Sequence, residues 1–317
     1  MLTAEDIRTA AHRLAPIVRR TPIVDLHPTA FGASHSVSLK LESMQVSGSF
    51  KLRGATNKLL SMRREELAHG VTTASGGNHG SGVARAARSL GVPATVFVPV
   101  GTPMFKQAAI RSQGAEVIVV GAAWDEADRH AREDATRRGA VYVHPFADPL
   151  VMAGQGTVGL EIVEQVAPLD ILLVAIGGGG LIGGVSVAVH DVRPDVRIIG
   201  IEPEGAPKMR ESVRLGHVVE LPGLTTRAGS LASRRTTEAN LALVQRHVEQ
   251  IVLVSDAEMQ AAVEWLDREL AISVELGGAA ALAALLGNKI DVTGAAVCAV
   301  VCGRGPHLHE AGANEPR

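Results

Sequence analysis

Aromatic residues are scarce in this sequence of 317 residues, which contains five Phe, two Trp and one Tyr. Proteins that bind single-stranded nucleic acid usually stack its bases on aromatic side chains, so the scarcity argues against that mode of binding. The 31 Lys and Arg residues nearly balance the 33 Asp and Glu residues, and the net charge is -2. We therefore expect no broad electropositive surface for nucleic acid, and we expect small molecules as partners.

The sequence is also poor in cysteine and has no long apolar run. Its two cysteines, Cys298 and Cys302, are four residues apart in AAVCAVVCG, where a strand would point both toward the same face. We expect no disulfide between them. No apolar stretch approaches membrane-spanning length, and no charged-then-apolar leader follows Met1. The expectation is a soluble, cytoplasmic protein without a membrane partner.

Short β-branched runs alternate with Ala-rich helical segments from about residue 70 onward. This alternation is typical of βα units around a parallel sheet, and it predicts a doubly wound α/β fold. Nearer the N-terminus, Thr3 is a candidate helix N-cap and VSLKLES predicts a strand. The other expected strands lie in GVTTAS, ATVFVP, AEVIVVG, AVYVHP, DILLVAIG, VRIIGIE and AAVCAVVCG.

The first segment suited to chemistry is ESMQVSGSFKLRGATNKLL, in which Lys51 follows SGSF near the start of a predicted helix. Partial burial beside Phe50 and Leu52, and the positive end of the helix dipole, would lower the pKa of Lys51. The resulting neutral amine can attack an aldehyde. Taken alone, this segment also fits a solvated lysine at a helix start.

The second segment is TTASGGNHGSGVARAAR, where a strand runs into a turn and then a helix. Free backbone N–H groups at such a helix start bind anions, and the two glycines of the turn allow close approach, so a substrate carboxylate fits there. Asn78 is suited to hydrogen-bond a ring oxygen or to cap the helix. His79 also fits a purely structural role. The residues expected to bind the substrate are Ser75, Gly76, Gly77 and His79.

The third segment, DILLVAIGGGGLIGGVSVAV, is an apolar strand followed by four glycines and a helix. Such glycines offer successive N–H groups to a phosphate at the carboxyl end of a core strand, where open α/β sheets bind ligands. The segment also matches G-x-G-x-x-G, and Glu202 ends the next strand. A dinucleotide-binding protein is therefore an alternative, although it gives Lys51 and Asn78 no role.

In this order, SGSFKLRGA, SGGNHG and GGGGLIGG resemble the pyridoxal-phosphate (PLP) enzymes of fold type II, in particular the serine/threonine dehydratase and serine racemase family. The resemblance covers residues 21–303. It implies that Lys51 carries PLP as a Schiff base beside Phe50 and that Asn78 contacts the 3′-oxygen of the cofactor. The residues implied to bind the phosphate are Gly177, Gly178, Gly179 and Gly180.

The resemblance also implies an architecture of two doubly wound parallel-sheet domains with the cofactor in the cleft between them. The large PLP-binding domain would comprise residues 1–69 and 148–317, and a small mobile domain would comprise residues 70–147. A homodimer is the assembly that the family suggests.

The same resemblance places Cys302 near the pyridine nitrogen of PLP. A neutral thiol would leave that nitrogen unprotonated, and a weaker electron sink suits elimination better than transamination. Arg304 and Gly305 depart from the family, which commonly has Gly and Asn at these positions. An inert core cysteine is the alternative for Cys302, and a PLP-binding protein without catalytic activity is an alternative for the chain.

The expected reaction removes water from L-serine, L-threonine or a related 3-hydroxyamino acid and yields a 2-oxo acid and ammonia. Lys51 would remove the α-proton. Racemases of the family have a serine immediately before the Gly-Asn pair, where this chain has Gly76, and Phe146 also resembles the dehydratases. An amino-acid racemase is the alternative activity.

Relatives of this family often bind a divalent cation through a Glu, a main-chain carbonyl and a downstream Asp. Glu202 and Ala206 match that scheme, but Lys208 stands at the Asp position. An ammonium is a poor companion for a metal ion and can neutralise Glu202 directly. We therefore expect no metal site, and a surface Glu and Lys without any such relationship are the alternative.

Overall fold

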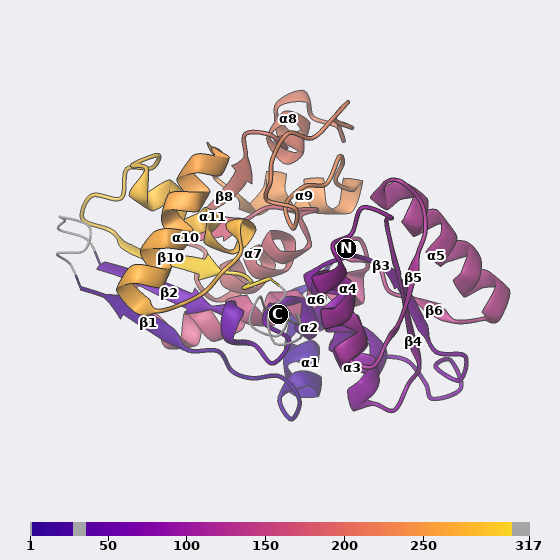
Figure 1. Ribbon diagram of the computed structural model, residues 1–317. Helices are drawn as coiled ribbons and strands as arrows, with labels where there is room; N and C mark the ends of the chain where they lie inside the picture. Colours follow the sequence, from indigo (N-terminus) through magenta and orange to yellow (C-terminus); the bar gives the residue numbers. More distant parts are fainter. Residues whose placement is uncertain (1, 28–35, 306–317) are drawn as a thin grey trace.

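Two β-sheets organise the chain into two lobes, which lie side by side in Figure 1. The computed structural model describes residues 2–27 and 36–305, so residues 306–317 of the predicted large domain lie outside the described part. Within the described residues, six strands form the sheet of the large lobe and four form the sheet of the small lobe. Most neighbouring strands pair in parallel, which confirms the predicted α/β class.

The sheet of the large lobe has the strand order β1-β2-β10-β7-β8-β9. β1 pairs antiparallel with β2, and the other neighbours pair in parallel. All residues of β7 and β10 are buried, as expected for central strands covered on both faces. The strands are β1 Ile23–Leu26, β2 Ser36–Leu41, β7 Ile171–Ala175, β8 Arg197–Pro203, β9 Gln250–Val254 and β10 Ala296–Val301.

Two groups of helices pack around this sheet. α11 contacts β7, β8, β9 and β10 and packs against α10, whereas α6 and α7 pack against each other and contact α1. Thr3 caps α1 in a capping box with Asp6, which confirms the predicted N-cap. The helices are α1 Ala4–Leu14, α6 Pro149–Gln165, α7 Gly180–Val192, α8 Lys208–Leu215, α9 Glu238–His247, α10 Asp256–Leu270 and α11 Leu276–Leu286, with a short 3-10 helix, η2, at Glu42–Met44.

The sheet of the small lobe has the order β5-β4-β3-β6, and all its strands are parallel. α5 covers one face, and α3 and α4 lie on the other (Figure 1). The elements are β3 Val71–Ala74, α3 Asn78–Ser89, β4 Ala94–Val98, α4 Met104–Ser112, β5 Glu116–Val119, α5 Trp124–Arg138 and β6 Val141–Tyr142.

α2, which spans Lys51–Leu60, connects the two lobes. It packs against α3 of the small lobe and against α6 of the large lobe. Its apolar residues Leu52, Ala55 and Leu59 belong to the same buried cluster as Val71 of β3. The first residue of α2 is Lys51, so the packing of both lobes fixes the position of this lysine.

The segments predicted to bind the cofactor and the substrate follow the carboxyl ends of parallel strands. β7 leads into Gly177–Gly180, and β10, its parallel neighbour, leads into Cys302. β3 of the small lobe leads into the turn before Asn78. Open α/β sheets bind ligands at such edges, so the functional site is expected there.

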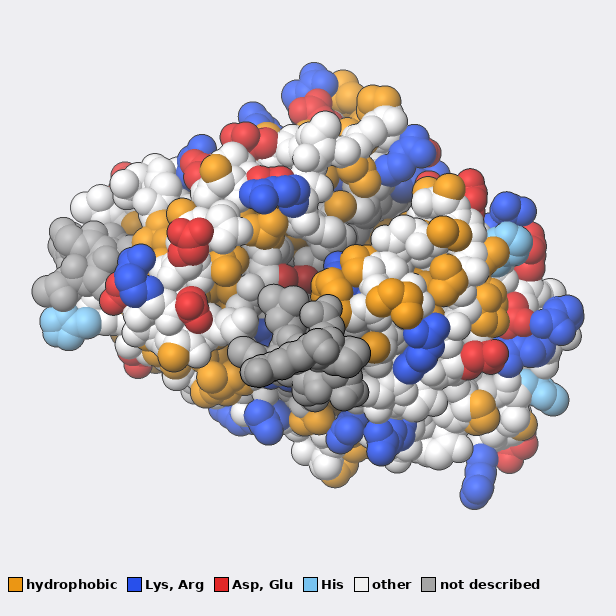
Figure 2. All heavy atoms as spheres, in the orientation of Figure 1, with side chains coloured by type: hydrophobic (Ala, Val, Ile, Leu, Met, Phe, Trp, Pro, Cys, Tyr) orange, Lys and Arg blue, Asp and Glu red, His pale blue; other side chains and the backbone are white. Residues whose placement is uncertain are grey.

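Side chains of both charges are interspersed over the face shown in Figure 2, together with apolar groups on the small lobe. Val100 and Met104, around the start of α4, are 67% and 70% exposed. Among the helices described, none is long and apolar enough to cross a bilayer.

Candidate active site

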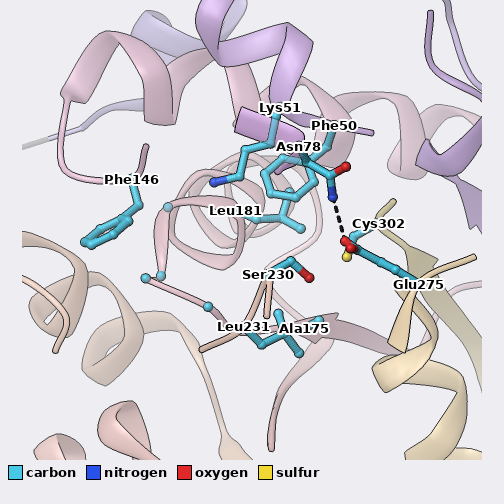
Figure 3. A pocket seen from close by; sticks show the side chains of 14 residues that line it. Phe50, Lys51, Asn78, Phe146, Ala175, Leu181, Ser230, Leu231, Glu275 and Cys302 are labelled. Carbon is cyan, nitrogen blue, oxygen red and sulfur yellow. Dashed lines mark hydrogen bonds between the residues drawn. The ribbon is translucent and has the colours of Figure 1, made fainter. Parts of the chain in front are cut away.

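Residues of both lobes line one pocket between the strand ends (Figure 3). Every residue that the sequence analysis assigned to the cofactor lies in its wall. Two polar lining residues, Ser230 and Glu275, were not predicted. The lining residues are Phe50, Lys51, Asn78, Phe146, Ala175, Gly177, Gly178, Gly179, Gly180, Leu181, Ser230, Leu231, Glu275 and Cys302.

The Lys51 amine lies inside this pocket rather than in solvent. Its Nζ atom donates a hydrogen bond to the carbonyl oxygen of Pro145 at 2.8 Å and lies 5.1 Å from the ring centroid of Phe50. Burial lowers the pKa of Lys51 to about 8, although Cys302 and Glu275 oppose the change. About a tenth of the amine is then neutral at pH 7. The predicted lowering of the pKa is confirmed, and the solvated lysine is wrong.

The turn formed by Gly177–Gly180, called the glycine turn below, leaves no space for larger residues. A β-carbon on Gly178 would lie 2.2 Å from Cγ of Phe146, and one on Gly177 would lie 2.9 Å from the carbonyl oxygen of Ser230. Gly179 has a φ of 98°, in the left-handed region that favours glycine. Gly180 begins α7, and no described side chain caps this helix, so its first N–H groups are available to an anion.

Asn78 points across the pocket from the small lobe to the large lobe (Figure 3). Its Nδ2 donates to Oε1 of Glu275 at 2.6 Å, and the backbone of Gly77 takes the N-cap position of α3. The alternative of a capping side chain is therefore wrong. Burial raises the pKa of Glu275, and hydrogen bonds from Ser230 and Asn78 oppose this rise. The only sequence signal for Glu275 was an acid just before a glycine-rich helix.

Cys302 lies at the end of β10 with its thiol on the wall of the pocket. Its Sγ donates to the carbonyl oxygen of Gly277 at 3.4 Å. Burial raises the pKa of the thiol to about 12, and the charge of Glu275 adds to this rise, so the thiol is neutral near pH 7. Cys298 is buried in β10, and both cysteines are free.

The segment that departs from the family, Arg304 and Gly305, packs beside this wall. The N–H of Arg304 donates to the carbonyl oxygen of Gly48 at 2.9 Å. A β-carbon on Gly305, whose φ is 73°, would lie 3.2 Å from Cβ of Glu275.

The residues predicted to bind the substrate are close by, but they are not among the described residues that line this pocket. Gly77 donates its N–H to Oγ of Ser75 at 3.3 Å, and a β-carbon on Gly76 would lie 2.8 Å from Cγ2 of Thr102. His79 is buried with Nε2 at 3.0 Å from the carbonyl oxygen of Val143. Burial lowers the pKa of His79 to about 3. The part that these four residues play in substrate binding stays a prediction.

Glu202 and Lys208 form a fully buried ion pair, with Nζ 3.0 Å from Oε1. The ammonium also donates to the carbonyl oxygens of Ile176, Ala206 and Leu231 at 3.2, 3.4 and 3.2 Å. Burial lowers the pKa of Lys208, and the charge of Glu202 opposes this. The ammonium takes the place among these oxygens that a divalent cation would need, so a metal ion does not fit. The alternative of an unrelated surface pair is wrong.

The carboxylate of Glu202 has further partners that bear on the dinucleotide alternative. It accepts hydrogen bonds from the N–H groups of Met209 and Arg210 at 3.0 and 2.8 Å, at the start of α8. Its exposed fraction is 0%. The acidic residue of the G-x-G-x-x-G fingerprint is therefore bonded inside the protein and cannot bind a ribose hydroxyl.

A buried amine with a lowered pKa and a glycine turn for a phosphate, set in one pocket between two α/β lobes, define the class of fold type II PLP enzymes. The sequence profile of the family described as pyridoxal-phosphate dependent enzymes matches residues 14–303. The chain belongs to this family, and PLP is its cofactor.

Known proteins resemble the chain over nearly its whole length. It is 42% identical to an L-threonine ammonia-lyase of Geobacter sulfurreducens, over 94% of this chain and 74% of that protein. It is 40% identical to an L-threonine ammonia-lyase of Thermotoga maritima, over 96% of this chain and 75% of that protein. The solved structure of maize serine racemase is similar with a TM-score of 0.92 and 32% identity, covering 98% of this chain and 95% of that one.

Proposed function

We propose that the chain is a PLP-dependent dehydratase, or ammonia-lyase, which removes water from L-threonine, L-serine or a related 3-hydroxyamino acid. One observation carries the proposal: Lys51 and the glycine turn line the same pocket, so the aldehyde and phosphate ends of one PLP molecule can be held together. The relatives named L-threonine ammonia-lyase support this choice of reaction.

Each chemical group of the cofactor has a partner of suitable character in the pocket. Lys51 would bond to the aldehyde carbon, and the N–H groups of Gly177–Gly180 would bind the phosphate. Asn78 would donate to the 3′-oxygen, and the neutral thiol of Cys302 would face the pyridine nitrogen. When bound, PLP supplies an electron-withdrawing ring that stabilises negative charge at the α-carbon of the substrate.

The chain itself supplies a base and an anion site for the substrate. The Lys51 amine, free once the substrate amine has taken its place, would remove the α-proton as a general base. Its pKa of about 8 keeps part of the amine neutral near pH 7. The N–H groups around Gly76 and Gly77, before α3, would hold the substrate carboxylate. The proton that Lys51 has taken up would let the β-hydroxyl leave as water, and hydrolysis of the released enamine would give the 2-oxo acid and ammonia.

We also infer that the small lobe moves during turnover. Both lobes line the pocket, and Asn78 of the small lobe is hydrogen-bonded across it to Glu275 of the large lobe. Separation of the lobes would break this bond and widen the entrance for an amino acid. The domain boundaries near residues 70 and 147, a homodimeric assembly and a cytoplasmic location stay predictions based on the sequence.

The test is an assay of purified protein with L-threonine and L-serine, which measures 2-oxo acid and ammonia. The protein should be yellow, and borohydride should fix PLP covalently on Lys51, as mass spectrometry would detect. Lys51→Ala should lose both the absorption band and the activity. Covalent PLP on a different lysine, or activity in Lys51→Ala, would contradict the proposal. Bound PLP on Lys51 without any 2-oxo acid would favour a non-catalytic PLP-binding protein.

A further inference from the structure

Glu275 is a pocket residue for which the proposed chemistry has no role so far. It stands directly before α11, at the N-cap position, yet its side chain makes no capping hydrogen bond to that helix. The carboxylate instead lines the pocket beside Cys302, and Figure 3 shows it directed toward Asn78. A role in capping the start of the helix therefore does not explain its orientation.

The backbone around Glu275 is shaped to let its carboxylate reach Asn78. A β-carbon on Gly303 would lie 2.9 Å from Nδ2 of Asn78 and 3.5 Å from Oε1 of Glu275, so a side chain there would crowd their hydrogen bond. A β-carbon on Gly277 would lie 2.3 Å from Oγ of Ser230, which also donates to Glu275. Glycines thus leave space for both donors of the carboxylate.

The hydrogen bond between Asn78 and Glu275 fixes which end of the amide faces the large lobe. A carboxylate oxygen only accepts hydrogen bonds, so the amide nitrogen of Asn78 must face Glu275, and the distance of 2.6 Å is that of a strong, charge-assisted bond. One N–H of Asn78 is used in this way, and the other is left for a ligand oxygen. Glu275 thereby determines how the amide presents itself to the cofactor.

Glu275 also acts on Lys51 through its charge. The carboxylate favours the charged form of Lys51, and Lys51 in turn favours the charged form of Glu275. For Cys302 the same charge favours the neutral form, because it contributes to the raised pKa of the thiol. One carboxylate is therefore coupled to the amine that holds the cofactor and to the thiol expected at its ring nitrogen.

We propose that Glu275 is a positioning residue of the PLP site, which orients the amide of Asn78 and places a negative charge in the pocket wall that Lys51 also lines. This inference rests on the proposed role of Lys51. The two parts of the proposal can be separated, because Glu275→Gln keeps an oxygen acceptor but removes the charge, whereas Glu275→Asp keeps the charge but shortens the side chain by one methylene.

The first experiment measures how fast the full-length apoprotein captures PLP as a function of pH, with borohydride trapping on Lys51. A neutral amine is needed for capture, so the rate should rise with pH around the pKa of Lys51. In Glu275→Gln the midpoint should move to lower pH by about one unit, which makes capture below the midpoint about tenfold faster. Glu275→Asp should keep the midpoint, and so should the control Glu264→Gln, which removes an exposed charge from α10.

The second experiment records the absorption band of bound PLP and the melting temperature. In Glu275→Asp the band should shift as it does in Asn78→Ala, and in Glu275→Gln it should stay near its original position. If both variants kept the original pH profile and band, or if both lost them only with a matching loss of melting temperature, Glu275 would be merely structural. Failure of the original protein to capture PLP on Lys51 would instead overturn the proposed function.

Discussion

The ammonium of Lys208 lies 3.0 Å from the carboxylate of Glu202, and neither side chain has any exposed surface. Three main-chain carbonyl oxygens complete the surroundings of the ammonium. One of them belongs to Ile176, the residue before the glycine turn, and another belongs to Leu231, which lines the pocket. The lysine thus acts as a fixed internal cation that ties α8 to the back of the candidate phosphate site.

A consequence is that the protein should not depend on a divalent cation. Chelators and added magnesium or calcium should leave the melting temperature and the rate unchanged. Lys208→Met should lower the free energy of unfolding by about 3–5 kcal/mol, because it leaves Glu202 buried without its partner. Denaturation in urea measures this loss. Arg210→Met, which removes a charge from the exposed side of α8, is the control. Strong activation of the unaltered protein by magnesium would contradict this account.

The glycine turn makes a second prediction, about the affinity for PLP. Gly178→Ala places a methyl group where Cγ of Phe146 would be only 2.2 Å away, so the turn or the ring must shift. The dissociation constant for PLP, measured by fluorescence titration, should rise by tenfold or more, since one misplaced hydrogen bond to a charged group is worth about 1.5–3 kcal/mol. Gly223→Ala is the matched control because its β-carbon meets nothing within 4 Å. Equal affinities in the two variants would rule out the turn as the phosphate site.

The central strands of the fold could be predicted from the sequence, whereas two edge strands could not. β7 and β10 are continuous apolar runs, because both of their faces are buried. β9 has no fully buried residue before Val254, and β1 has only four residues, including the exposed Asp25. Edge strands keep one side free, so their composition overlaps with that of loops.

The residues of the site also differ in whether the sequence predicts them. Lys51 and Gly177–Gly180 stand in contiguous motifs, because each acts through the local geometry of one turn or helix start. Glu275 has no such motif, since its role depends on Asn78, which is 197 residues away in the sequence and belongs to the other lobe. Only the packing of the two lobes brings these two side chains together. Sequence patterns can therefore indicate the cofactor but not the residue that orients its contact.

The third prediction concerns stability in acid and follows from His144. Its Nδ1 accepts hydrogen bonds from the N–H groups of Phe146 and Ala147 at 3.1 and 2.9 Å, which requires an unprotonated Nδ1. Burial lowers the pKa of His144 to about 4, below the value of about 6.5 in an unfolded chain. Between these pH values the unfolded chain binds a proton that the folded chain does not, so stability falls as the pH drops from about 6.5 to 4.

The loss from His144 should be at most about 1.4 kcal/mol per pH unit in that window, and urea denaturation at a series of pH values measures it. His144→Asn keeps an oxygen acceptor for the turn and removes the titrating ring, so its stability should vary less with pH. His217→Asn, at an exposed position, should follow the unaltered protein. A profile for His144→Asn as steep as that of His217→Asn would contradict the role given to His144.

The last prediction separates dehydration from racemisation at Gly76. With no side chain there, Lys51 would be the acid and base on one face of the α-carbon, and no group would return a proton to the other face. L-serine should therefore yield 2-oxo acid and ammonia with only traces of D-serine, because a missing general acid typically costs about 10²–10⁴-fold. The structure adds a steric condition: a β-carbon on Gly76 would lie 2.8 Å from Cγ2 and 3.0 Å from Oγ1 of Thr102.

The test therefore combines Gly76→Ser with Thr102→Ala, which removes the crowding atoms and lets the loop keep its path. The double variant should form D-serine, detected by chiral chromatography, faster than the control pair Gly76→Ala with Thr102→Ala, which has the same shape without a hydroxyl. Thr102→Ala alone should behave like the unaltered protein. If the unaltered protein interconverts L- and D-serine as fast as it forms 2-oxo acid, then Ser75 or a water molecule supplies the second proton, and the chain is a racemase as much as a dehydratase.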